Sequence, residues 1–523
     1  MQRWQWPRRP QGHEVSATRE ATRQAFRRVF PGIMVAMFLA AADQTILASA
    51  LPTIASSLHG FADLSWVVIS YLLAATIAAP LYGHLSDHFG RRRMLMVALA
   101  VFTLASAACA FAPTLLALIV ARAVQGLGGG GLMTLAQALI GEHVPPRERG
   151  RFAGYFAVLF TLSSTAGPIL GAYLTEHFGW RAVFTINLPL GALAWLLAMR
   201  IPVAHAARRP KSFRLDFVGA VLFAVATAAL LYALSSAGHR YGWGDWQLLA
   251  LIGVAGGGYL ALWSWETRFE HPVIPVRFLR YPAIIRSDVV VFCFAATLFG
   301  TVLYLPLYLQ LGRGVGIGTS GLLLLPITLT MALVSSLVGR LIAHTGNTTL
   351  FPQVGLALAS VAFLLLAASV VRAPTWTVMA LTGFVGMGLS MVMPPTQVVV
   401  QHAAGREALG AATATIAFSR SVGGATGTAI VGTLLVVLLG ASGPGLPVSL
   451  DRAIEAGGGN RGALSQVERE ALVSRLDGSY RVIFLVLAGI AAAGALVART
   501  VPQPDWDAED AVPATAGRGG GAA

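Results

Sequence analysis

Fourteen long apolar stretches, most of them free of charged residues, constrain the fold of this chain more than any other feature of its sequence. Each stretch holds about 20 residues, the length that an α-helix needs to cross the ~30 Å hydrocarbon core of a bilayer. Of the 523 residues, 56% are hydrophobic and only 11% are charged, a composition that excludes a soluble or disordered protein. We therefore expect an all-α polytopic membrane protein. Its predicted spans cover residues 30–52, 64–83, 94–112, 115–137, 152–174, 182–199, 217–237, 246–265, 289–311, 319–339, 349–371, 375–398, 408–440 and 482–498.

The basic residues are distributed unevenly between the two sides of the predicted membrane. Of the 37 lysines and arginines, 26 fall on the side that carries both termini, nine on the opposite side and two within spans. The positive-inside rule therefore predicts that both termini are cytoplasmic. The net charge of +14 is dispersed over short loops and a basic tail, 1–28, which lacks a small-residue cleavage site. This dispersal argues against nucleic-acid binding and makes membrane lipids the expected partners. The C-terminal tail, 501–523, is predicted to be disordered and cytoplasmic.

A short segment recurs in the two halves of the chain. Residues 83–90 read GHLSDHFG and residues 339–346 read GRLIAHTG, so four of eight positions match, and each segment follows the second span of a set of six. Recurrence of this kind is typical of duplicated transporters, although two unrelated turns could also produce it. A duplication predicts a six-helix bundle over 29–200, two inserted helices with cytoplasmic loops over 201–285, and a second six-helix bundle over 286–500. The outer loop 441–480 would form a helical hairpin or a solvated linker.

Three charged residues interrupt the predicted spans: Asp43, Arg122 and Arg420. An ionisable residue inside the membrane is costly and indicates function by default. At 1.5 Å per residue, Asp43 and Arg122 fall at similar depths in the outer half of the bilayer, so they can pair if the first and fourth spans are neighbours. Such a pair could bind and release a proton as its access to water changes. The alternative is a permanent ion pair that only holds two helices together.

Glycine and proline mark several predicted helices. Gly126, Gly128 and Gly131 match G-x-G-x-x-G, but no strand precedes them, so a dinucleotide site is rejected and close helix packing is expected. Gly167, Pro168 and Gly171 favour a bend in the fifth span.

Enzyme and pump signatures are missing from the sequence. Lys211 is the only lysine and does not fit a P-loop, which excludes an ATP-driven pump of that class. No Ser/His/Asp set or metal-ligand spacing was found, so we expect a protein that is not an enzyme and that uses no metal or cofactor.

Several of these motifs together resemble the major facilitator superfamily. The segment from Gly83 to Arg93 resembles its signature loop, Arg122 with Gln125 and Gly126 resembles its fourth-helix motif, and residues 167–171 resemble the fifth-helix motif of its antiporters. Residues 42–54 and 180–191 look specifically like the fourteen-span drug:proton antiporter branch. The resemblance implies the major facilitator fold with fourteen helices arranged as 6 + 2 + 6.

The resemblance also implies roles for individual residues. Asp43 would be the proton-coupling acid and Arg122 its partner, with Arg420 grouped beside them as a further intramembrane charge. Gly167, Pro168 and Gly171 would let the fifth helix bend. Two departures stand out: His88 occupies a position that is usually basic and could make the gate pH-sensitive, and Ala343 replaces the acid in the second-half copy. The cytoplasmic gate loop would comprise Gly83, Asp87, His88, Gly90, Arg91 and Arg92.

These features together predict a secondary transporter of the bacterial inner membrane that exports lipophilic drugs or toxic compounds in exchange for protons. Because only one acid is buried, neutral, weakly acidic or monocationic substrates are expected. Tyr71, Gln125 and Gln397 are candidate cavity residues, although each glutamine could instead bond helix to helix. The alternative cargo is a lipid or a secreted metabolite. A periplasmic adaptor is a candidate partner; without one we expect a monomer.

Overall fold

The computed structural model is helical throughout the part of the chain that it describes, apart from one isolated bridge between Ala237 and Tyr241. The described residues are 28–58, 65–144, single positions within 155–171, 173–202, 216–237, 241–268 except 243, 278, 281–315, 323–369, 374–405, 408–440 and 466–504. The helices are α2 (Phe30–Leu58), α3 (Ser65–Phe89), α4 (Arg91–Ala110), α5 (Leu115–His143), α7 (Ala182–Thr185), α8 (Asn187–Ala198), α9 (Phe217–Ser236), α10 (Trp246–Glu266), α11 (Pro282–Leu311), α13 (Leu325–Thr345), α14 (Leu350–Ser369), α15 (Thr375–Ser390), α16 (Met393–Ala404), α17 (Leu409–Gly440) and α19 (Gln466–Ala498).

Eleven spans within these described helices are long and apolar enough to cross a membrane, which supports a multi-pass membrane protein. Described helices coincide with every predicted span except the fifth, most of which lies outside the described residues. The twelfth predicted span is divided into α15 and α16. Pro394 and Pro395 begin α16, and a proline there cannot continue the hydrogen-bond ladder of the preceding helix.

Several predicted helix boundaries were wrong by six residues or more. Residues 83–89 are the last two turns of α3 and not a loop, because the helix ends only at Gly90, whose φ of 92° favours glycine. Helix α11 begins at Pro282, seven residues before the predicted start. Helix α19 begins at Gln466, so the C-terminal third of the predicted outer loop is helical, while 441–465 lies outside the described residues.

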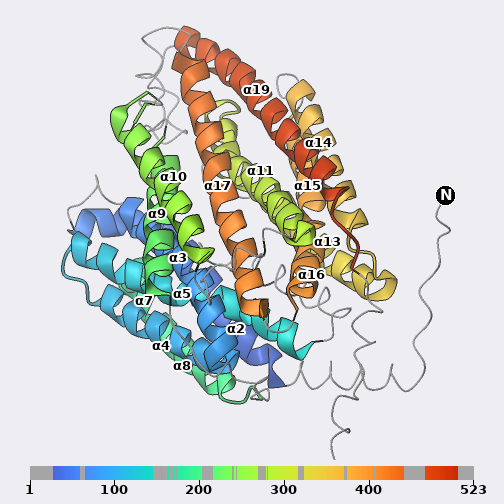
Figure 1. The fold of residues 1–523 in the computed structure, drawn as a ribbon. Coiled ribbons are helices and arrows are strands. Elements are labelled where there is room, and N and C mark those ends of the chain that lie inside the picture. The colour runs from blue at the N-terminus through green and yellow to red at the C-terminus, as the bar shows by residue number, and fades with distance from the viewer. Residues whose placement is uncertain are drawn as a thin grey trace, which may run out of the picture.

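Helices of the two halves pack in the same pattern. In the first half α5 contacts α3 and α4, and α8 contacts α2 and α4; in the second half α15 contacts α13 and α14, and α19 contacts α11 and α14. The two groups lie side by side, with the blue and cyan helices on one side and the yellow to red helices on the other (Figure 1). The repeated segments also end alike, since Gly90 after α3 and Gly346 after α13 both have positive φ. This repetition supports an internal duplication.

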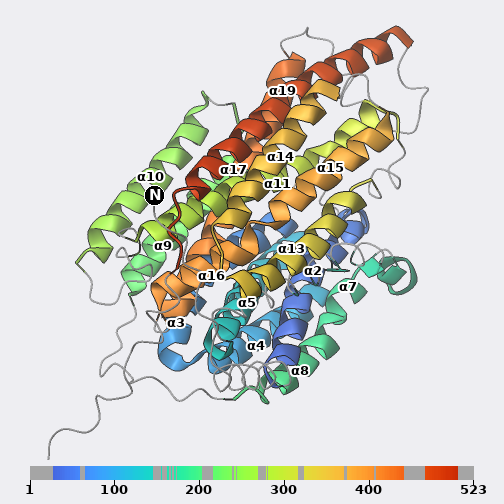
Figure 2. The same ribbon diagram turned by 90° about the vertical axis from the view of Figure 1, so that its right-hand side faces the viewer.

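The helices α9 and α10 pack against each other beside the two bundles, where α9 contacts both α3 and α17 (Figures 1 and 2). Aromatic rings make these contacts: Trp66 of α3 lies 5.2 Å from Tyr232, and Phe223 lies 5.6 Å from Phe418 of α17. The pair therefore touches both halves of the molecule.

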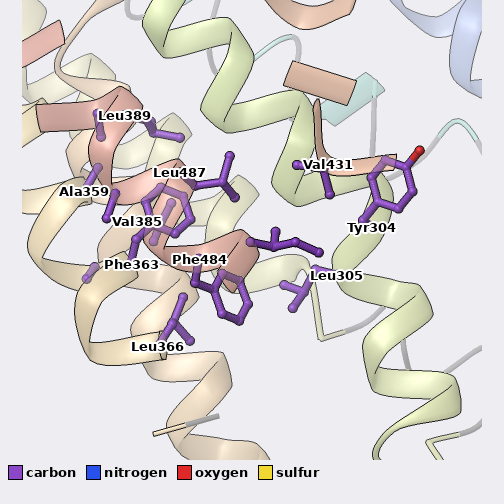
Figure 3. Packing of buried hydrophobic residues seen from close by; sticks show 14 of the residues in the cluster. Tyr304, Leu305, Ala359, Phe363, Leu366, Val385, Leu389, Val431, Phe484 and Leu487 are labelled. Carbon is purple, nitrogen blue, oxygen red and sulfur yellow. The ribbon is translucent and has the colours of Figure 1, made fainter. Parts of the chain in front are cut away.

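Each half has its own apolar core. In the second half, Phe363 of α14 stacks 6.3 Å from Phe484 of α19, and Leu305, Leu389 and Leu487 fill the space around them (Figure 3). The lipid-facing surface is apolar as well, with many exposed large side chains such as Leu104 and Leu260. Such a surface is expected where the solvent is hydrocarbon.

Candidate functional site: a buried carboxylate network

Asp43, near the middle of α2, is 1% exposed and accepts hydrogen bonds from side chains of two other helices. Arg122 of α5 donates from Nη1 to Oδ2 at 2.6 Å, which makes a buried ion pair. Gln125, one turn along α5, donates to Oδ1 at 2.8 Å. Asn187, the first residue of α8, also donates to Oδ1, at 2.7 Å. The carboxylate therefore connects α2, α5 and α8 at one point.

A second layer of contacts fixes the donors. Ser106 of α4 accepts a hydrogen bond from Gln125 at 2.8 Å, and its own hydroxyl donates to the Phe102 carbonyl. Arg122 also donates from Nε to the Val67 carbonyl of α3 at 3.2 Å and from Nη1 to Gln125 Oε1 at 2.6 Å. Four helices of the first bundle thus hold the guanidinium and the amide in place.

Tyr71 of α3 lies flat against this network. The Arg122 Cζ atom is 4.3 Å from the centroid of its ring, within the range of a cation–π contact. The ring reaches this position because α3 and α5 approach closely: a Cβ on Gly126 would collide with the backbone of Tyr71. The small residues of α5 therefore pack helices, as the sequence predicted, and in doing so they bring Tyr71 to Arg122.

Three donors, one of them the Arg122 guanidinium, therefore compensate the buried Asp43 carboxylate. Asp43, Arg122 and Gln125 are each at most 1% exposed, so water does not reach the pair in this conformation. Proton exchange at Asp43 consequently requires the surrounding helices to move.

The sequence had identified Asp43 and Arg122 and their similar depth, but it had missed two members of the network. Asn187 and Ser106 carry no formal charge and do not interrupt an apolar run, so the search for charges passed over them. Gln125 had been considered a cavity residue or a helix-to-helix bond, and its contacts are of the second kind. Tyr71 and Gln397 are also buried in this structure, and their role in a cavity stays a prediction.

A second polar cluster lies at the end of α3. Asp87 accepts hydrogen bonds from the backbone N–H groups of Gly410, at 3.2 Å, and Ala411, at 3.3 Å. These are the first-turn amides of α17, whose N-terminus carries positive dipole charge, so a carboxylate is well placed there. Because α17 belongs to the second half, this contact joins the two bundles. Gly83, one turn earlier, meets the Gly410 backbone directly.

Arg91 and Arg92 fix the first-half side of that cluster. Arg91 pairs with Asp87 at 2.7 Å and with Glu142 of α5 at 3.3 Å. Arg92 donates to the Met199 carbonyl at the end of α8, at 2.6 Å. His88 lies edge-on to Phe89, with ring centroids 4.8 Å apart. The predicted gate residues therefore lie on the last turns of α3, at Gly90 and on the first turn of α4.

The remaining predicted residues lie apart from these clusters. Gly167 packs against Thr45 of α2, whose hydroxyl donates to the Ser163 carbonyl, and Gly171 is buried. Pro168 lies outside the described residues. Arg420 is on α17 and does not join the network of Asp43 and Arg122. Its role in proton coupling stays a prediction.

One acid of the second half had been missed. Asp288 lies two turns into α11 and accepts a hydrogen bond from Thr415 of α17 at 3.3 Å. Asp288 directly precedes the predicted span 289–311, so it was assigned to a loop. An acidic residue in a loop does not indicate a functional site. Only the earlier start of α11 shows that this acid belongs to a helix.

Two similar helical bundles with a buried ion pair and a charged contact between them define a multi-pass membrane transporter. The model of the Major Facilitator Superfamily matches residues 33–428. The chain belongs to this superfamily, whose members are transporters and not enzymes.

Several bacterial proteins are similar in sequence. An uncharacterised MFS-type transporter of Mycobacterium tuberculosis is 35% identical over 79% of this chain, and the match covers 60% of that relative's length. The multidrug transporter protein MdtP of Bacillus subtilis is 30% identical, over 77% of this chain and 74% of its own. The multidrug resistance protein Stp of M. tuberculosis is 31% identical, over 80% and 77%.

Solved structures show the same fold. The human organic anion transporter MFSD10 superposes with a TM-score of 0.63 at 18% identity, covering 90% of this chain and 99% of the other. The proton:xylose symporter XylE gives 0.58 at 14% identity, covering 90% and 95%. At these identities the likeness extends to the fold alone.

Proposed function

We propose that this protein exports lipophilic drugs or toxic compounds across the bacterial inner membrane in exchange for protons. It would do so with fourteen spans arranged as 6 + 2 + 6, both termini in the cytoplasm, and the proton gradient as its only energy source. The buried network around Asp43 is the observation that carries the proposal. Relatives that are named as multidrug transporters support the choice of cargo.

The contacts of Asp43 support the proposal of proton coupling. Protonation would remove the charge that Arg122 pairs with and would leave a guanidinium buried without its counter-ion. The first bundle can avoid that cost by moving α2, α5 and α8 apart so that water reaches Arg122. A proton at Asp43 would in this way change the packing of three helices, which is what coupling requires.

Alternating access is supported by the contact between the bundles. Asp87 joins α3 to the start of α17, and α17 also contacts α5. These contacts close the cytoplasmic side in the predicted orientation. Opening to the cytoplasm would break the hydrogen bonds of Asp87, with the fifth helix bending at Gly167, Pro168 and Gly171. Protonation of His88 would add charge beside this gate and make it pH-sensitive.

An exporter of a lipid or a secreted metabolite is the second candidate. A specific observation favours it: the Acurin A biosynthesis cluster MFS-type transporter of Aspergillus aculeatus is 32% identical over 77% of this chain. The fold and the coupling network serve either cargo equally well.

Accumulation of fluorescent probes in a drug-sensitive bacterium tests the proposal. Cells that express the chain should retain several-fold less of at least one neutral, cationic or anionic lipophilic probe than cells with an empty vector. An uncoupler that collapses the proton gradient should abolish the difference. A reduction that survives the uncoupler would contradict proton coupling, whereas a changed lipid or metabolite profile without any probe export would favour the second candidate.

A further inference from the structure

Asp288 of α11 is an acidic residue inside an apolar, membrane-spanning helix, and it takes no part in the network around Asp43. It lies six residues after Pro282, about 9 Å from the start of a span that extends to Leu309. An ionisable residue at such a position is costly and indicates a function. We propose that Asp288 is a second proton-binding residue of this transporter, which carries its proton in this conformation and releases it when α17 moves away from α11.

The surroundings of Asp288 are apolar. Ile284 and Val291 lie one turn before and one turn after it on the same face of α11, and both are buried. They belong to an apolar cluster that joins α11 to α16 and α17. The cluster consists of Phe278, Ile284, Val291, Val400, Ala408, Ala411, Ala412 and Ile416. A charged carboxylate on this face has few groups to replace its water, whereas a protonated acid needs fewer.

The hydrogen bonds at Asp288 fit a protonated acid. Within the described chain its single hydrogen-bond partner is the Thr415 hydroxyl, at 3.3 Å. The same hydroxyl donates to the Ala412 carbonyl at the shorter distance of 3.0 Å. Because a hydroxyl has one proton to donate, it cannot satisfy both acceptors. A protonated Asp288 would instead donate to the Thr415 oxygen, and every donor of the group would then have an acceptor.

The carboxylate of Asp43 is compensated in a different way. It accepts hydrogen bonds from Arg122, Gln125 and Asn187, and the guanidinium supplies the opposite charge. None of the described ion pairs includes Asp288. Asp43 is 1% exposed, whereas Asp288 is partly exposed. Asp288 can therefore exchange a proton in a conformation in which Asp43 cannot.

Few charged or histidine residues lie near this end of α11 on the helices that pack against it. They are Arg286 of α11 itself, Arg420 of α17, His402 in the last turn of α16 and Arg499 directly after α19. Arg286 donates to the Thr500 carbonyl, and Arg420 lies about 140° around α17 from Thr415. The charged residues within α19 lie in its first half, away from this end. The charge of Asp288 therefore depends on its own proton and not on an ion pair.

Asp288 lies beside the end of α17 that meets the first bundle. Asp87 of α3 accepts hydrogen bonds from the N–H groups of Gly410 and Ala411. Thr415 is one turn further along the helix. Loss of the proton would leave a carboxylate in the apolar cluster, and water can surround it only if α11 and α17 separate. That separation would move the end of α17 that Asp87 holds, so proton release would favour opening to the cytoplasm; the inference rests in this respect on the proposed antiport.

Dicyclohexylcarbodiimide, which reacts with protonated carboxyl groups in apolar surroundings, tests the inference on the wild-type protein. Asp288 is the only acidic residue of the tryptic peptide Ser287–Arg313, so mass spectrometry assigns the label directly. In the full-length protein in lipid nanodiscs at about pH 7, Asp288 should be labelled several-fold more than the exposed Asp245. An unlabelled Asp288, or a label no greater than that of Asp245, would overturn the inference.

Accumulation of ethidium in proteoliposomes tests the coupling role. With the membrane potential clamped at zero, each coupled proton raises the limiting accumulation by up to about tenfold per unit of pH difference. Asp288→Asn keeps the shape of the protonated acid, so it should lower that limit about tenfold at a difference of about one unit and preserve probe-for-probe exchange. Asp288→Glu, which retains an acid, should recover most of the accumulation. The matched control Asp245→Asn should behave as the wild type.

A limit that Asp288→Asn leaves unchanged would overturn the inference. If that variant does not fold, the labelling of the wild-type protein still decides whether Asp288 is protonated.

The proposed function can fail separately. Labelling of Asp288 without any proton-driven accumulation would leave Asp288 as a protonated acid and refute the antiport. Proton-driven accumulation by a wild-type protein in which Asp288 is not labelled would do the reverse.

Discussion

At the scale of single residues, the account depends on how completely Asp43 is satisfied. Its two oxygens accept three side-chain hydrogen bonds, from Arg122, Gln125 and Asn187. Each donor is itself buried, so the loss of one leaves an unpaired polar group in a medium that cannot replace it. The carboxylate therefore stabilises the packing of α2 against α5 and α8. A change in its charge would disturb that packing.

Asn187 allows that dual role to be measured. Asn187→Ala should lower the unfolding free energy by about 1–2 kcal/mol, because a buried hydrogen bond to a charged group is removed. Asn187→Asp should cost more, since it sets a second carboxylate against Asp43 at nearly the same geometry. Thermal unfolding of the purified protein in detergent, with both variants beside the wild type, gives the order. An Asn187→Asp protein as stable as the wild type at neutral pH would refute the placement of Asn187.

Much of this site could be predicted from the sequence, and what could not has a physical reason. Asp43 and Arg122 stand out because charge is rare in apolar runs, and the helical rise gives their depth. Asn187 and Ser106 do not stand out, because neutral polar side chains are common in membrane helices. Arg420 also stood out, but its depth alone could not show that it makes no contact with Asp43 and Arg122.

At the scale of elements, the helix faces that carry glycine determine which helices approach closely. Gly126 and Gly130 of α5 lie against the backbone of α3, and Gly423 and Gly427 of α17 lie against the backbone of α11. The absence of a side chain lets these helices meet at their main chains, as in other membrane proteins. The close packing in turn positions the side chains of the buried network.

Gly130→Ala should be destabilising by about 1–3 kcal/mol, because the added methyl group would collide with the Ala75 backbone of α3. Gly489→Ala is the matched control: it lies within α19 with nothing near its Cβ position, so the same change should be neutral or slightly stabilising. Thermal unfolding of both variants under one set of conditions makes the comparison. Equal effects at the two positions would mean that α3 and α5 are not in close contact.

The positions of the helices were predictable because each needs an apolar run, whereas their ends were not. Hydropathy cannot distinguish a polar helix end from a loop, which is why the last turns of α3 and the first turns of α19 had been taken for loops. The division between α15 and α16 was visible in principle, since Pro394 and Pro395 lie within the apolar run.

At the scale of the whole molecule, the two bundles play different electrostatic roles. The first encloses the ion pair of Asp43 with Arg122, and the second contains Arg420, which belongs to none of the described ion pairs. Asp87 joins the two bundles by accepting hydrogen bonds from the first turn of α17. A proton that acts on the first bundle would then affect the second through this contact.

Gradient-driven accumulation in proteoliposomes tests the central claim most directly. With an acidic lumen, the wild-type protein should accumulate a lipophilic probe whose charge does not titrate, such as ethidium or 1-anilinonaphthalene-8-sulfonate. Asp43→Asn should lose this accumulation by about tenfold or more yet still exchange probe for probe, because a neutral side chain permits movement but carries no proton. The exposed Asp245→Asn, in the turn before α10, should behave as the wild type. Undiminished proton-driven accumulation by Asp43→Asn would contradict the account.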